Sequence, residues 1–67
     1  MIEYSNSAIS KAIDEWIHSQ RDRDILKARY IDGLTYERIA EKFDLSVRQT
    51  KNIIYKASDQ LFKKVRF

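Results

Sequence analysis

The chain has 67 residues, of which 34% are charged, and it contains neither cysteine nor proline. A chain of this length has room for one small core, so we expect residues 1–67 to form a single domain with a stability of roughly 3–5 kcal/mol. The lack of cysteine excludes disulfides and thiolate metal sites. The sequence has no apolar run of membrane-spanning length and no signal-peptide pattern, which predicts a cytoplasmic protein without a membrane partner.

Positive charge is concentrated near the end of the sequence. The formal net charge of the whole chain is +3, but residues 47–67 carry six Lys and Arg against one Asp, giving +5. Residues 1–46 carry seven basic and nine acidic residues, giving −2. A basic third on a slightly acidic remainder is typical of a protein that binds a polyanion on one side. A solvated helix face would have the same composition, so charge alone leaves both interpretations open.

The first half of the chain predicts two amphipathic helices. The sequence has a single glycine and no proline, so it has little turn chemistry for hairpins. Apolar residues recur at helical spacing in the first segment: Ile9, Ala12, Ile13, Trp16 and Ile17. Ser19 and Asp22 have capping-box spacing and open a second helix, which Gly33 ends as a left-handed residue. The inward positions of this second helix are Ile25, Leu26 and Tyr30.

The second half predicts two further helices joined by a tight turn. Thr35 can cap a third helix over about 35–43, and the run Asp44-Leu45-Ser46 breaks it. Ser46 then caps a fourth helix from about 47 towards 64, with Gln49 completing a capping-box spacing. The apolar face of the third helix holds Ile39, Ala40 and Phe43, and that of the fourth holds Thr50, Ile53, Ile54, Ala57, Leu61 and Val65.

In so short a chain the four apolar stripes must share one interior, which predicts an all-α fold of four helices in one compact domain. The expected core includes Trp16, Leu26, Tyr30, Ile39, Phe43, Leu45 and Ile53. Two short helices at a steep angle over about 35–57, the second polar and basic, form a helix-turn-helix that can place its second helix in the DNA major groove.

The side-chain types on the fourth helix match the chemistry of DNA. Four residues in its first half are candidates for reading base edges: Arg48, Gln49, Lys51 and Asn52. Of these, Lys51 can take either guanine or phosphate. Val47 can touch a thymine methyl group or simply secure the helix start. Tyr55, Lys56 and Lys63 are expected to meet sugar and phosphate. Thr35, Tyr36 and Arg38, at the start of the third helix, can add phosphate contacts, although Tyr36 suits the core equally well.

The runs DILKARYIDGLTYERIAEKFDLS and VRQTKNIIYKASDQL combine an apolar-rich helix ending in Arg-Tyr, a short glycine loop and a basic final helix. From Arg21 to Leu61 the chain thereby resembles region 4 of the bacterial sigma factors, the helix-turn-helix domain that reads the promoter −35 element. The positions in register are Arg29-Tyr30, Gly33-Leu34-Thr35, Ile39-Ala40, Leu45-Ser46, Ile53 and Lys56-Ala57. Asp44 replaces the usual turn glycine and Thr50 replaces a buried Val or Ile, changes that the motif tolerates.

The resemblance implies a sequence-specific, double-stranded DNA-binding protein that acts without a cofactor or metal. The chain shows nothing like the region that binds the −10 element, so it is most similar to small sigma-like regulators of phages and mobile elements. A nucleophile–histidine arrangement and a glycine-rich phosphate loop are both absent from the sequence, which argues against an enzyme.

Two alternative functions, and the role of two aromatic residues near the end of the sequence, stay open from the sequence. The chain can act mainly as an interaction module that docks on RNA polymerase or an anti-sigma-like protein. It can also be the DNA-targeting domain of a recombination or packaging system. Phe62 and Phe67 lie off the main stripe, where they can either form a homodimer surface or fold back over the first helix.

Overall fold

The computed structural model describes residues 6–64 as four helices, with no strand among them, so the predicted all-α fold is confirmed. The helices are α1 (Asn6–Trp16), α2 (Gln20–Tyr30), α3 (Tyr36–Phe43) and α4 (Val47–Lys64). None of these helices is long and apolar enough to cross a membrane.

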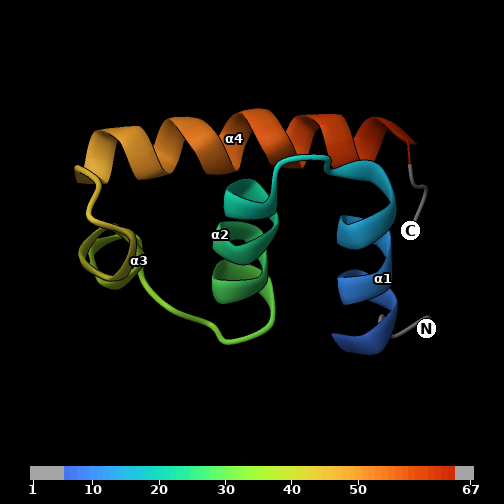
Figure 1. Cartoon of the computed structure of the whole chain (residues 1–67), viewed down its shortest axis with the longest axis horizontal. Coiled ribbons are helices and arrows are strands. Elements are labelled where there is room, and N and C mark those ends of the chain that lie inside the picture. The colour runs from blue at the N-terminus through green and yellow to red at the C-terminus, as the bar shows by residue number, and fades with distance from the viewer. Residues whose placement is uncertain (1–5, 65–67) are drawn as a thin grey trace.

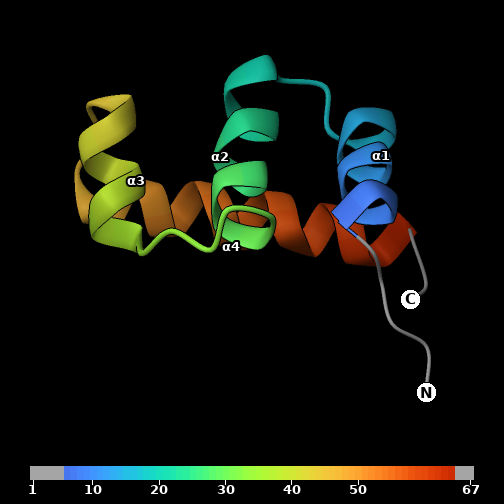
Figure 2. The same cartoon turned by 90° about the horizontal axis from the view of Figure 1, so that it is seen from below.

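Helix α4 runs along the longest dimension of the molecule, and the other three helices cross it one after another (Figures 1 and 2). Helix α3 lies at the start of α4, α2 near its middle and α1 near its end. Helix α4 contacts each of the others, and α2 lies between α1 and α3, which do not touch each other in the described residues. An ion pair of 2.7 Å between Lys27 Nζ and Asp14 Oδ1 joins α2 to α1.

The core is formed by aliphatic side chains from all four helices. The fully buried large residues are Ile13, Ile25, Leu26, Ile39, Ile54, Leu61 and Thr50. Leu26 and Ile39 are therefore buried as predicted, and Phe43, Leu45 and Ile53 pack against the core while remaining partly exposed. Val65, expected on the same face of α4, lies outside the described residues.

Two aromatic residues predicted for the core are exposed instead. Trp16 is the last residue of α1 and lies at the edge of a buried face centred on Ile13 and Ile17, so 37% of its surface remains exposed. Tyr30 is 38% exposed, because it packs at the margin of the core with its hydroxyl 2.7 Å from Ser58 Oγ. Helical periodicity identifies the face that a residue belongs to, but not how far the neighbouring helices extend along it.

The turn between α3 and α4 forms as its residues predict. Asp44 is the only non-glycine residue in the described chain with a positive φ, at 57° and with ψ 49°, in the left-handed region. Ser46 Oγ accepts from the backbone N–H of Gln49, and Gln49 Oε1 accepts from that of Ser46, both at 3.0 Å. The buried hydroxyl of Thr50 donates back to the Ser46 carbonyl at 3.0 Å. The predicted capping box is confirmed. The turn also shows how the motif tolerates its two changes, because Asp44 takes the left-handed conformation itself and the Thr50 hydroxyl bonds back to the helix backbone.

The other helix ends also follow the sequence. Thr35 Oγ1 accepts from the backbone N–H of Arg38 at 3.2 Å, and Ser19 Oγ accepts from that of Asp22 at 3.4 Å, so both residues are N-caps. Gly33 has φ +71° and lies in the turn after α2, which itself ends at Tyr30. A left-handed glycine here lets the chain reverse direction between α2 and α3 without the strain that a Cβ would add.

Replacing Ile39 by Ala should lower the free energy of unfolding by roughly 2–5 kcal/mol, because it removes a fully buried side chain from the packing between α3 and α4. Urea denaturation followed by circular dichroism measures this change. Glu41→Ala, an exposed change on the same helix, serves as the control and should have little effect. Equal stabilities of the Ile39 variant and the control would disprove the core assignment.

Candidate nucleic-acid interface

The face of α4 that points away from the core carries a row of three exposed polar side chains. Arg48, Asn52 and Lys56 follow one another at intervals of four residues, so they lie along one side of the helix. The buried residues of α4, among them Thr50 and Ile54, lie on the opposite side. Within the described part of the chain, the three side chains make no hydrogen bond or ion pair, which leaves their polar groups available to a ligand.

The two other candidates at the start of α4 are partly committed to the fold. Gln49 is exposed, but its side-chain oxygen accepts the Ser46 N–H, so only the amide nitrogen remains to donate. Val47 is half-buried at the first position of the helix. Gln49 and Val47 therefore belong to the cap of the helix as well as to its exposed start.

Four side chains from three helices meet on one flank of α4, around the ring of Tyr36. The Arg29 guanidinium lies 4.4 Å from the centre of this ring, and Lys51 Nζ lies 5.5 Å from it. The ring of Tyr55 meets that of Tyr36 edge-on, with centroids 6.2 Å apart and planes at 82°. Arg29 also donates to the Leu34 carbonyl at 3.0 Å, which secures the guanidinium next to the start of α3. We call Arg29, Tyr36, Lys51 and Tyr55 the tyrosine cluster.

Tyr55 keeps its proton within the tyrosine cluster. A hydrogen bond with Tyr36 raises the pKa of Tyr55, and the nearby Tyr36 phenol acts in the same direction, whereas the positive charge of Arg29 lowers it. The net shift is upward, so the Tyr55 phenol is neutral at physiological pH. With 58% of its surface exposed, this phenol can form hydrogen bonds outside the protein.

Of the three candidate phosphate-binding residues at the start of α3, only one packs against α4. Tyr36 is half-buried against α4 in the tyrosine cluster, and the neighbouring Thr35 is exposed, with its hydroxyl accepting the Arg38 N–H. Arg38 is exposed and lines a separate shallow hollow with Leu34, Glu41 and Lys42, to which α4 contributes no residue.

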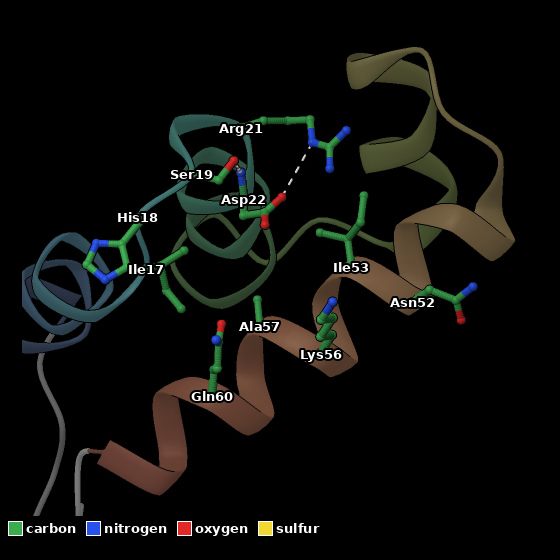
Figure 3. A pocket seen from close by; sticks show the side chains of 10 residues that line it. All are labelled: Ile17, His18, Ser19, Arg21, Asp22, Asn52, Ile53, Lys56, Ala57 and Gln60. Carbon is green, nitrogen blue, oxygen red and sulfur yellow. Dashed lines mark hydrogen bonds and ion pairs between the residues drawn. The ribbon is translucent and has the colours of Figure 1, made fainter.

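An open groove of about 450 Å³ follows the other flank of α4, between that helix and the start of α2 (Figure 3). Asn52 and Lys56 line it from α4, and His18 and Arg21 line it from the opposite side. Arg21 Nε lies 3.4 Å from an oxygen of its neighbour Asp22, so its charge is partly balanced. No group of three or more His, Cys, Asp and Glu side chains in residues 6–64 is placed to hold a metal ion.

The charge pattern of α4 changes beyond Lys56. Asp59 is the next charged residue on the outward side, and its carboxylate pairs with Lys63 Nζ at 3.0 Å, one turn further on. Both side chains are well exposed, so the pair contributes little to stability, but it reduces the net positive charge of this end of the helix. Among the described side chains, the basic charge of the outward face that no ion pair balances therefore lies between the turn and Lys56.

Sequence reasoning missed Arg29 and the groove for one physical reason. Arg29 and Tyr36 meet across the turn between α2 and α3, and Arg21 faces Lys56 across a separation of 35 positions. Such neighbours depend on how the helices cross, which no local spacing encodes. The tyrosine cluster had only two local signals in the sequence. They are Arg29 at the end of one predicted helix and Tyr36 at the start of the next.

The family model Sigma-70, region 4 matches residues 19–63, which includes α2, α3 and nearly all of α4. No curated protein and no solved structure matches the chain significantly. The family is one of helix-turn-helix DNA-binding domains and not a class of enzymes. With the match covering well over half of the chain, and with the fold and exposed basic helix described above, the protein belongs to the sigma-70 region 4 family of DNA-binding domains.

Proposed function

We propose that the chain is a small, sequence-specific DNA-binding regulator of transcription, organised as one domain with its helix-turn-helix at about 35–57. The observation that carries the proposal is the exposed row of Arg48, Asn52 and Lys56 on the second helix of a motif whose family binds DNA. A groove-bound helix reads bases with the side chains on its outward face. Because a chromosomal or phage DNA target lies in the cytoplasm of a bacterium, we expect the protein to be cytoplasmic as well.

The residue types divide into readers and anchors. Arg48 suits guanine, because its guanidinium can donate two hydrogen bonds to the O6 and N7 edge, and Asn52 suits adenine in the same way. Gln49 and Val47 lie beside them and can add a polar and a methyl contact. Lys56 and Tyr55 lie one turn on, where sugar and phosphate are closer than base edges. Thr35, Tyr36 and Arg38 belong to the start of α3, which favours phosphate through the helix dipole.

A second candidate function is docking on RNA polymerase or an anti-sigma-like partner. It is favoured by two exposed aromatic residues, Tyr30 and Phe62, whose rings meet edge-on 6.1 Å apart at the far end of α4 from the turn. Phe62 retains 49% of its surface exposed, and Phe67, the other half of the expected homodimer surface, lies outside the described residues. This surface is separate from the row that we assign to DNA, so both functions are compatible with one chain.

We further propose that the chain is of the type found in small phage or mobile-element regulators. Its α1 adds a helix in front of the region that the family model matches. A DNA-targeting role in recombination or packaging would use the same reading helix. It differs from transcription regulation in the kind of genomic site that lies next to the bound sequence. The test is to select bound duplexes from a random pool and to locate the resulting motif in the genome. Motifs near promoters would support a role in regulation, whereas motifs at recombination or packaging sites would refute that role.

Replacing Arg48 by Ala should relax the preference at one base pair and cost about 1–3 kcal/mol of discrimination there, because a bidentate guanine contact is lost. Competition binding against single-base variants of the selected duplex measures this. Lys11→Ala, a change at an exposed residue of α1, is the control and should leave the base preferences intact. If affinity for the selected and for random DNA fell by the same factor, Arg48 would be a phosphate contact.

Replacing Lys56 by Ala should weaken binding to all duplexes about equally and flatten the dependence of log affinity on log salt by about one unit, because one phosphate contact is lost. Lys63→Ala is the comparison variant: the sequence also suggested phosphate for Lys63, but in the structure this side chain is paired within the protein. We expect it to change the slope less, since its ammonium is already paired with Asp59. Affinity measured from low to physiological salt provides both slopes. A Lys56→Ala slope equal to that of the unmodified chain, or a loss confined to one base pair, would contradict the assignment of Lys56.

A further inference from the structure

We propose that Tyr36 is a positioning residue that holds Lys51 at the flank of α4, so that Lys51 binds DNA phosphate and does not read a base. This inference rests on the proposed function. It separates Lys51 from Arg48 and Asn52, which the sequence pattern places beside it on the same helix.

The first observation is the exposure of these side chains. Lys51 is half-buried, whereas Arg48, Asn52, Tyr55 and Lys56 are all exposed. A lysine aimed outward from a helix surface has a long, solvated stem, so partial burial means that this one leans against the protein. It leans towards α3, since its ammonium nitrogen lies 5.5 Å from the centre of the Tyr36 ring, within the range of a cation–π interaction.

The second observation is that the ring itself is held in place from the other helices. Arg29 at the end of α2 stacks on Tyr36 at 4.4 Å and is secured by its hydrogen bond to the Leu34 carbonyl. The ring of Tyr55 meets Tyr36 edge-on on the α4 side. A ring that is supported in this way offers Lys51 a fixed docking point on the flank of α4, beside the outward row of Arg48 and Asn52 and not within it.

The third observation concerns charge. Two cations, Arg29 and Lys51, lie near one ring, and within residues 6–64 neither is paired with a carboxylate. Cations held close together without a counter-ion favour an anion between or beside them. The flank also adjoins the start of α3, whose backbone N–H groups favour negative charge. The anion that a DNA duplex supplies at the edge of the groove is its phosphate.

The test uses the full chain and three variants, Lys51→Met, Tyr36→Phe and Tyr36→Leu. Affinities are measured for the selected duplex, its single-base variants and random DNA, at several salt concentrations. Lys51→Met should weaken binding to every duplex by the same factor and flatten the salt slope by about one unit, with base preferences unchanged. Tyr36→Phe keeps the ring face that holds Lys51, so it should keep the base preferences of the unmodified chain even if the lost hydroxyl had contacted a phosphate, because phosphate contacts carry no base preference.

Tyr36→Leu keeps apolar volume but removes the ring face, so Lys51 is released. We expect an altered preference at one base pair, and the double variant Tyr36→Leu with Lys51→Met should lose this alteration. A merely structural role for Tyr36 would not produce a change that depends on Lys51. An unaltered preference in a folded Tyr36→Leu protein, with folding checked by circular dichroism, would overturn the proposal.

Lys51→Met tests whether Lys51 binds phosphate or reads a base even if Tyr36→Leu fails to fold. A uniform loss across duplexes supports the phosphate assignment, and a loss confined to one base pair refutes it. The unmodified chain separates this inference from the function on which it rests. If that chain showed no preference for any duplex, the proposed function would fail and the inference with it. A base-specific defect of Lys51→Met in a chain that does select its site would overturn the inference alone.

Discussion

The turn between α3 and α4 is the constraint on which the rest of the interface depends. Asp44 takes a left-handed conformation, the Leu45 N–H donates to the Ala40 carbonyl at 2.8 Å, and Ser46 caps α4, which begins at Val47. The reciprocal hydrogen bonds of Ser46 and Gln49 then set the first turn of α4. Since an α-helix has a fixed rotation per residue, the position of this first turn determines where Arg48, Asn52 and Lys56 point.

The packing of three helices along α4 explains why a small core is sufficient to hold the fold. The long helix α4 is supported along its length by α3, α2 and α1 in succession, and Ile39, Ile25 and Ile13 are each completely buried in these helices. Because α4 packs against the other helices on one side only, its opposite side faces solvent and need not be apolar. That side can carry polar and charged residues at little cost in stability. The division between a buried and a polar face is what allows one helix to serve both the fold and a ligand.

Much of this architecture could be predicted from sequence because its determinants are local. The Thr35 and Ser46 caps, the left-handed Asp44 and the buried hydroxyl of Thr50 all act within four residues of their partners. The sequence could not locate Trp16 and Tyr30 correctly, because their burial depends on where neighbouring helices end. It also missed the stacking of Arg29 on Tyr36, which depends on how α2 and α3 are placed.

Amide chemical shifts recorded by NMR during titration with a selected duplex test most directly whether the outward row of α4 is the DNA-reading surface. We predict that the large shifts fall at the start of α3 and in the first half of α4, with Arg48 and Asn52 among the strongest. Little change is expected near Tyr30 and Phe62. Shifts concentrated at these two aromatic residues, with the row of α4 unaffected, would contradict the account.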